Sequence, residues 1–132
     1  MKRLLISVAA VTAGLALSVA SATAGTAPSL TITPDDFFFC CGAATVVKQY
    51  EVTNTGGSGS GELSVDLSYA AEYPGRNLVI TQDRCTGKSL GPNKTCLIEI
   101  TWLHGADTLA YLTISSTKAL QLSQEMYATV VP

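Results

Sequence analysis

The four cysteines are the residues of this 132-residue chain that are best able to do chemistry. They are Cys40, Cys41, Cys85 and Cys96. Their spacing fits no zinc site, because no C-x2-C pair occurs and His104 is the only histidine. An even number of cysteines favours disulfide bonds where a chain is exported to an oxidising compartment.

Cys85 and Cys96 bracket ten residues, including two glycines and a proline, so a bridge between them would close a twelve-residue loop. In the chain-entropy account such a loop closure stabilises a fold by about 3 kcal/mol. That is a large share of the roughly 5–15 kcal/mol by which a domain is normally stable. We therefore expect Cys85 and Cys96 to pair with each other.

Cys40 and Cys41 are neighbours, which leaves their pairing open. Adjacent Cα atoms lie ~3.8 Å apart, whereas disulfides usually span about 4.4–6.8 Å. A vicinal bridge is therefore strained, and strained bridges are the reducible ones. Two bridges into the 85–96 loop, free thiols and an intermolecular bridge are the alternatives. A functional interpretation is a redox switch or a ring presented to a ligand, but we favour a structural bridge or a buried pair.

No catalytic constellation is readable in the sequence. His104 and Asp107 fall within one predicted turn, but a Ser–His–Asp triad needs the histidine to touch a serine. No serine stands in a G-x-S-x-G context. We therefore expect His104 to be an exposed turn residue, and we predict no catalytic, metal or cofactor site. An enzyme would need a reactive thiol of low pKa at Cys40 or Cys41.

The N-terminus has the pattern of a secretory signal peptide. A basic Lys2-Arg3 pair precedes an apolar stretch over residues 4–17, and small-residue cleavage sites end at Ala22 and Ala24. An uncleaved membrane anchor is the alternative, which the short apolar stretch disfavours. The sequence thus predicts a signal peptide over 1–24, one domain over 25–132, and a secreted or periplasmic protein.

The charge of the mature part excludes some partners. Removing Lys2 and Arg3 from the eight basic residues leaves six against ten acidic residues, a net charge of about −4. Phosphate groups require concentrated lysine and arginine, and residues 25–132 contain no such cluster. We expect no nucleic-acid partner, no stable membrane insertion after cleavage, and another protein as the partner.

Hydrophobic alternation predicts seven strands, over residues 27–33, 45–55, 62–69, 78–82, 95–103, 109–115 and 121–131. Residues 37–41 form an eighth strand or a crossover between sheets. The segment 62–69 is the clearest, because every second residue is apolar. Seven or eight short strands without a helix predict an all-β, immunoglobulin-like antiparallel β-sandwich. The short turns predict mostly sequential strand pairing. Trp102 is in phase with the core, and we expect it to pack against the disulfide.

Three motifs resemble bacterial immunoglobulin-like domains of the choice-of-anchor D type, which are related to the ASPM/SPD-2/Hydin (ASH) domains. They are Val-Thr-Asn-Thr-Gly-Gly at 52–57, the cysteine-bracketed segment 85–96, and Leu-Thr-Ile-Ser-Ser at 112–116. The resemblance implies an immunoglobulin-like fold that serves as a scaffold, spacer or interaction module. The vicinal cysteines and the lack of a closing L-x-G-x-G after Val131 depart from the family pattern.

Three consecutive phenylalanines, Phe37, Phe38 and Phe39, precede the vicinal cysteines. Neighbouring side chains of a strand point to opposite faces, so all three cannot face one core. Either the segment lies between the sheets, or at least one phenylalanine reaches the surface. We take the three as interaction candidates, on an edge strand that could accept another strand.

A carbohydrate- or small-ligand-binding module is the alternative function. Its stacking platforms would be Tyr50, Tyr69, Tyr73 or Tyr111. This hypothesis requires at least two of these rings to be exposed on one face.

Overall fold

The structure is a computed structural model that describes residues 26–41 and 44–130. The predicted signal peptide, its cleavage site at Ala24 and the last predicted strand residue, Val131, lie outside the described residues. Within the described ranges, no helix is long and apolar enough to cross a membrane.

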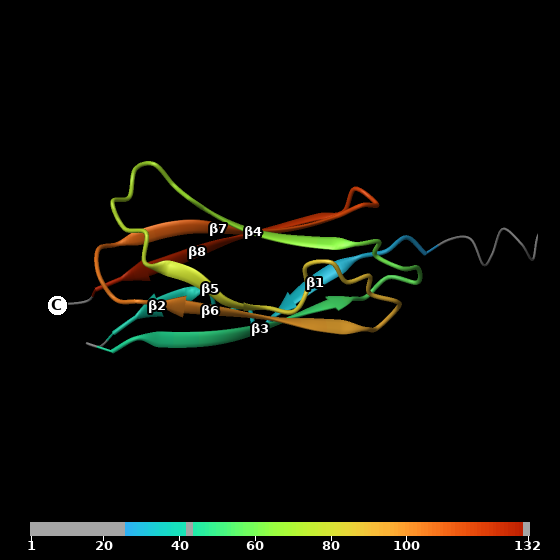
Figure 1. Ribbon diagram of the computed structural model, residues 1–132, viewed down its shortest axis with the longest axis horizontal. Helices are drawn as coiled ribbons and strands as arrows, with labels where there is room; N and C mark the ends of the chain where they lie inside the picture. Colours follow the sequence, from blue (N-terminus) through green and yellow to red (C-terminus); the bar gives the residue numbers. More distant parts are fainter. Residues whose placement is uncertain (1–25, 42–43, 131–132) are drawn as a thin grey trace, which may run out of the picture.

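The chain forms eight strands in two layers (Figure 1). They are β1 (Leu30–Thr33), β2 (Phe38–Cys40), β3 (Val46–Asn54), β4 (Leu63–Tyr69), β5 (Leu78–Asp83), β6 (Thr95–Trp102), β7 (Thr108–Ser116) and β8 (Gln121–Thr129). One sheet has the order β1-β3-β6-β5 and the other the order β2-β8-β7-β4. The predicted β-sandwich is confirmed, with strand bounds close to those that alternation predicts.

The order of strand pairing differs from the prediction. Only β5–β6 and β7–β8 join consecutive strands, so sequential pairing is wrong for the other pairs. The pairs are antiparallel except for β2 with β8, which is parallel. A turn brings two strand ends together but does not determine whether the strands share a sheet.

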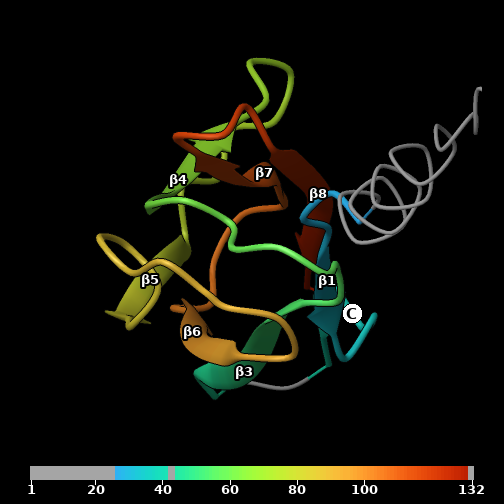
Figure 2. The ribbon, with the colours of Figure 1, turned by 90° about the vertical axis from the view of Figure 1, so that its right-hand side faces the viewer.

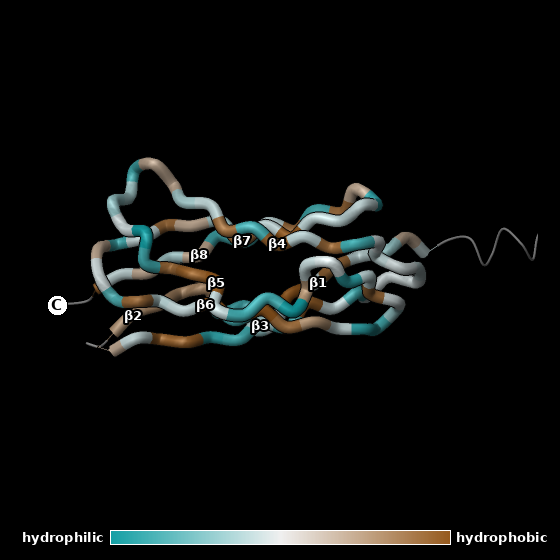
Figure 3. Tube along the Cα trace, viewed as in Figure 1, coloured by the Kyte–Doolittle hydropathy of each residue, from teal (hydrophilic) through white to brown (hydrophobic). Residues whose placement is uncertain are grey.

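The core lies between the two sheets and is built from alternate residues of each strand. Figure 3 shows this as apolar and polar colours that alternate along the strands. The largest fully buried side chains include Trp102, Tyr50 and Phe39. Trp102 pairs across the sheet with Val46 and Leu78. It stands six residues along β6 from Cys96, or roughly 20 Å, so the expected packing against the disulfide is wrong.

Asn54, in the motif at 52–57, is fully buried at the end of β3. Its Nδ2 donates to the carbonyl oxygens of Ser58 at 2.7 Å and Leu90 at 2.9 Å. Its Oδ1 accepts from the backbone N–H of Gly56 at 3.0 Å and of Ser29 at 3.2 Å. Every hydrogen-bonding position of the buried amide is thus used. The amide joins the segment before β1, the β3–β4 loop and the β5–β6 loop.

The two glycines of the same motif permit a close approach of the chain. A Cβ atom on Gly56 would lie 2.2 Å from the carbonyl oxygen of Ala27, and one on Gly57 would lie 1.7 Å from Oγ1 of Thr26. No real side chain fits at these distances. Residues 26–27 can therefore pass over the β3–β4 loop only because positions 56 and 57 are glycine.

Cys85 and Cys96 form the disulfide that the sequence predicts, with their Cα atoms 5.2 Å apart and both residues buried. The loop that they close also bonds to β4 of the other sheet. Leu63 N–H donates to the Lys88 carbonyl at 2.8 Å, and Gly87 N–H donates to the Leu63 carbonyl at 2.8 Å. Figure 2 looks onto this end of the sandwich, with the loop between β5 and β6 in the foreground. The bridge therefore stabilises a contact between the sheets.

We predict that Asn54→Asp lowers the free energy of unfolding by about 3 kcal/mol or more, because the carbonyls of Ser58 and Leu90 lose their donor. Thermal unfolding at neutral pH should show a melting temperature lower by more than about 10 °C. Asn93→Asp is the matched control on an exposed asparagine. Equal melting temperatures for the two variants would contradict the role of the Asn54 amide.

Candidate functional site

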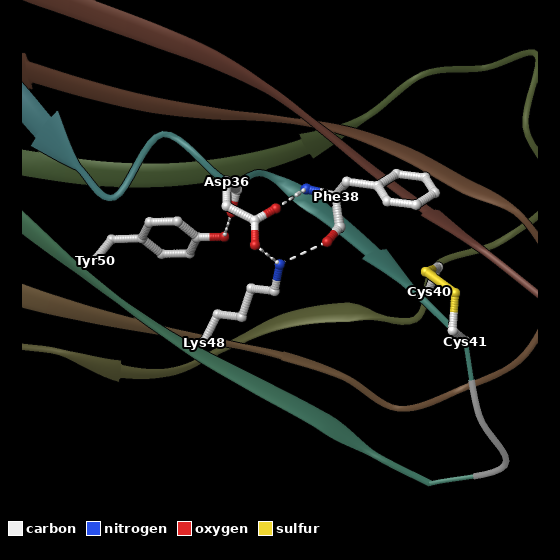
Figure 4. A network of polar contacts seen from close by, with 6 residues as sticks. All are labelled: Asp36, Phe38, Cys40, Cys41, Lys48 and Tyr50. Carbon is white, nitrogen blue, oxygen red and sulfur yellow. Dashed lines mark hydrogen bonds and ion pairs between the residues drawn. A yellow bond between two sulfur atoms is a disulfide. The ribbon is translucent and has the colours of Figure 1, made fainter.

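The second disulfide joins the neighbours Cys40 and Cys41, whose Cα atoms lie 3.7 Å apart. All four cysteines are in the described part of the chain, and none is free. Cys41 is exposed and Cys40 is half-buried. Of the alternatives that the sequence leaves open, the structure thus has the vicinal bridge. Figure 4 shows it at the end of β2.

The two disulfides lie at opposite ends of the sandwich. Cys40 is opposite Thr129, the last residue of β8. Cys96 is opposite Val52, near the far end of β3. The vicinal bridge therefore stands at the end that the 85–96 loop does not cover.

The three candidate phenylalanines have different surroundings because strand side chains alternate. Phe37 is half-buried and stacks on Tyr50, with ring centroids 5.1 Å apart. Phe39 is fully buried in the core. Phe38 is 44% exposed and stacks on Tyr127 at 5.8 Å. Of the three phenylalanines, only Phe38 thus offers a large apolar surface to a partner.

β2 is an edge strand, as the sequence suggests, but side chains cap its outer side. The N–H of Phe38 donates to Asp36 Oδ1 at 3.3 Å, and its carbonyl oxygen accepts from Lys48 Nζ at 2.6 Å. Lys48 Nζ also forms an ion pair with Asp36 Oδ2 at 2.6 Å (Figure 4). Both backbone groups that an added strand would use at Phe38 are therefore already bonded.

Lys48 belongs to the other sheet and lies on the core side of β3. β1 pairs only with residues 51–54 of β3, so β3 has no neighbour on that side at Lys48. The lysine side chain reaches across the space between the sheets to β2, with Nζ 4.9 Å from the Phe39 ring centroid. An inward-pointing charge of this kind is a recognised way to protect a sheet edge.

At neutral pH, Asp36 is ionised and Tyr50 is protonated, and both states favour this network. The hydrogen bond from Lys48, with a second from the Phe38 N–H, lowers the pKa of Asp36 below its ordinary value. Burial, with the nearby charge of Asp36, raises the pKa of Tyr50 well above the usual range. The Tyr50 hydroxyl thus stays protonated and donates to the Asp36 carbonyl at 2.8 Å.

Phe38 belongs to a row of aromatic side chains on the outer face of the β2-β8-β7-β4 sheet. Tyr73, from the β4–β5 loop, meets the Tyr127 ring edge-on at 5.8 Å. Leu109 of β7 is the cross-strand neighbour of Tyr127. Sequence reasoning missed Tyr127, although alternation in β8 places it opposite to the buried Met126 and Ala128.

The four tyrosines of the carbohydrate hypothesis are separated. Tyr50 is fully buried, and the half-buried Tyr69 has Arg76 5.1 Å above its ring. Tyr73 is half-buried in the aromatic row, and Tyr111 is 36% exposed on β7. Only Tyr73 and Tyr111 thus remain on one outer face.

The exposed large hydrophobic residues lie in one half of the sandwich. All five of those in the described ranges lie in the half with the vicinal disulfide; they are Phe38, Val47, Leu103, Tyr111 and Val130. We call this half the apolar end. The opposite half is closed by polar, glycine-containing loops.

His104 and Asp107 do not combine into a catalytic pair. His104 is half-buried rather than exposed as predicted, because its ring packs 5.1 Å from that of Trp102. Asp107 accepts a hydrogen bond from Thr129 at 2.8 Å. Within residues 26–41 and 44–130 there is no pocket and no group of three acidic, histidine or cysteine side chains that could hold a metal ion.

Comparisons with known proteins identify the fold. No family model matches the sequence, and a search of curated proteins finds no match. Among solved structures, the ASH/PapD-like domain of human CEP192 superimposes with a TM-score of 0.51 at 13% identity, over 77% of this chain and 84% of that chain. WR4, an MSP family member of C. elegans, gives 0.50 at 8% identity, over 77% and 97%.

The secreted serine protease VesC of Vibrio cholerae gives a TM-score of 0.57 at 16% identity and covers 88% of this chain. The chain spans only 27% of that protease. These likenesses show the fold alone. The ASH-like immunoglobulin-type fold that the sequence motifs imply is thereby confirmed.

We predict that Asp36→Asn lowers the melting temperature at neutral pH but not in strong acid. Because the folded protein lowers the pKa of Asp36, this carboxylate stabilises the fold above the ordinary value of 3.8, and this contribution is lost as the pH falls through the folded pKa. The melting temperatures of the wild type and the variant should therefore converge as the pH falls below 3.8 and through the lowered folded pKa. Asp35→Asn, which removes an adjacent charge, is the control. A difference that does not change with pH would contradict the ion pair.

We predict that Lys48→Met increases self-association, because it uncovers the Phe38 carbonyl on the outer side of β2. Light scattering after size exclusion should give a higher mean mass than for the wild type at equal concentration. Lys118→Met, an exposed lysine in the opposite half, is the control. The same mass for all three proteins would show that Lys48 does not protect the edge.

Proposed function

We propose that this protein is an exported, non-enzymatic β-sandwich module that binds another protein through its apolar end. The observation that carries this proposal is the position of the exposed large hydrophobic residues, which all lie in that half of the described structure. Contiguous exposed apolar surface commonly marks contact sites between proteins, and at this end Phe38, Tyr127 and Tyr73 form a contiguous aromatic row.

Export is supported by two features of the chain. Both cysteine pairs form disulfides, which persist mainly in oxidising compartments. The basic, apolar and small-residue pattern of residues 1–24 is that of a secretory signal. A part of the secreted protease VesC has the same fold, which is compatible with this location. We accordingly place the protein in the periplasm or outside the cell.

A binding role is supported by the fold, by the separation of His104 from Asp107, and by the pairing of the cysteines. The ASH/PapD-like and MSP domains that share the fold give no reason to expect catalysis. His104 and Asp107 contact different neighbours. The cysteines are paired rather than held as reactive thiols. We therefore assign the protein to the interaction modules rather than to the enzymes.

Phe38 is the residue on which we centre the contact. Its ring is held in place by stacking on Tyr127. Little side-chain entropy would therefore be lost when a partner covers the ring. Because Asp36 and Lys48 occupy the outer backbone groups of Phe38, the contact would use side chains rather than an added strand. Aromatic anchors surrounded by weaker contacts are typical of protein interfaces.

We predict that Phe38→Asp reduces capture of the partner at least about tenfold while the fold is kept, since an aromatic anchor typically contributes 2 kcal/mol or more. Crosslinking of the purified variant to the periplasmic or secreted fraction, followed by quantitative mass spectrometry, measures this. Gln121→Asp, on the exposed start of β8, is the control. A folded Phe38→Asp variant that captures every partner as well as the wild type would exclude Phe38 from the contact.

One observation favours a second candidate function, the binding of a carbohydrate. Tyr111 is exposed on the outer sheet face, and its cross-strand neighbour is Glu125, so a stacking ring lies beside a hydrogen-bonding carboxylate. Binding of the wild-type protein to defined oligosaccharides on a glycan array would favour this candidate over a protein partner.

A further inference from the structure

We propose that Cys40–Cys41 is a redox site, at which a dithiol reductant reduces the bridge in the folded protein while Cys85–Cys96 stays oxidised. The substrate class is a molecule or protein with two neighbouring thiols. The reaction itself is independent of the proposed interaction with a partner.

The two bridges differ in how accessible they are to a reductant in solution. Thiol–disulfide exchange begins with attack of a thiolate on one sulfur, so its rate depends on whether that sulfur can be reached. Cys41 is exposed and Cys40 is half-buried, at an end of the sandwich that the 85–96 loop does not cover. Cys85 and Cys96 are both buried in the core. A reductant can therefore reach Cys41 without any opening of the fold.

The backbone around the vicinal bridge also favours its opening. A single peptide bond holds the Cα atoms 3.7 Å apart, whereas unstrained bridges span about 4.4–6.8 Å. Cys41 has a φ of 65°, in the left-handed region that a side chain with a Cβ atom disfavours. Reduction removes the ring and allows Cys41 to leave this conformation. Cys85–Cys96, with its Cα atoms 5.2 Å apart, carries no such constraint on its spacing.

The fold does not depend on the vicinal bridge. A bridge between neighbours closes almost no loop, so it removes little entropy from the unfolded chain, unlike the twelve-residue closure by Cys85 and Cys96. β2 is held independently by its pairing with β8, by the buried Phe39 ring and by the contact of Lys48 with Phe38. Both redox forms should therefore be folded, as a reversible site requires.

The exchange is balanced in atoms and electrons. A thiolate of the reductant attacks Cys41 Sγ, the Sγ–Sγ bond breaks, and Cys40 leaves as a thiolate that takes up a proton. The second thiolate of the reductant then attacks the first sulfur of the reductant, which is bonded to Cys41 Sγ in the mixed disulfide. Cys41 is released as a thiolate that also takes up a proton. Two electrons and two protons pass to the protein, and the reductant becomes a disulfide.

The position of the bridge connects its redox state to the apolar end. Cys40 is two residues beyond Phe38 on β2, so alternation places both on the outer face of the sheet. Reduction would change the surface beside Phe38 from a ring to two thiols. This consequence rests on the proposed function, whereas the reduction itself does not.

Graded concentrations of dithiothreitol under native conditions test the proposal directly. After each incubation the free thiols of the purified protein are blocked with N-ethylmaleimide, and the modified cysteines are located by peptide mapping. We expect half-reduction of Cys40–Cys41 at a concentration about tenfold or more below that for Cys85–Cys96. Near-ultraviolet circular dichroism should show that the form with the vicinal bridge reduced is still folded.

Simultaneous reduction of the two bridges, earlier reduction of Cys85–Cys96, or unfolding on reduction of Cys40–Cys41 would each overturn the proposal. The double variant Cys40→Ser, Cys41→Ser is the control, and it should be folded and release no thiol at the lower concentration. Because these measurements need no partner, a failure of the Phe38 interaction would leave their result unaffected.

Discussion

The buried amide of Asn54 joins three segments that lie outside the paired strands. It bonds the chain before β1 through Ser29, the β3–β4 loop through Ser58, and the β5–β6 loop through Leu90. An unpaired amide at this depth would be costly, so all three segments must be in place together. The Cys85–Cys96 bridge then restricts the third segment in the unfolded chain as well. One end of the sandwich is thus fixed by hydrogen bonds and a covalent link.

The other end is organised by a different interaction. β1 pairs with only four residues of β3 before the chain crosses to the other sheet as β2, which leaves the backbone of a three-residue edge strand to be satisfied. Asp36 and Lys48 bond the outer groups of Phe38, and the lysine links the sheets through a charge rather than an apolar contact. Because the backbone edge is occupied, the recognition that we propose would use the side chains around Phe38.

The two disulfides have different physical roles because they differ in burial and in the length of the loop that they close. Cys85–Cys96 is buried and closes a long loop, so its contribution is to stability. Cys40–Cys41 is accessible and closes almost no loop, so its expected contribution to stability is small, and it is the bridge at which we propose thiol–disulfide exchange. The end that carries the buried bridge and the apolar end that carries the vicinal bridge are therefore separate.

The sequence by itself determined the local features of this protein. Alternation predicted most of the strands, and the loop length predicted the Cys85–Cys96 pairing. The run of three phenylalanines showed that the three side chains cannot all face one core. Only the tertiary structure decided which strands share a sheet, because turns do not specify sheet membership. It also decided which phenylalanine is exposed and that Lys48 reaches Phe38 from the other sheet. Contacts between segments distant in sequence leave no periodic signal, since they depend on how the two sheets are packed.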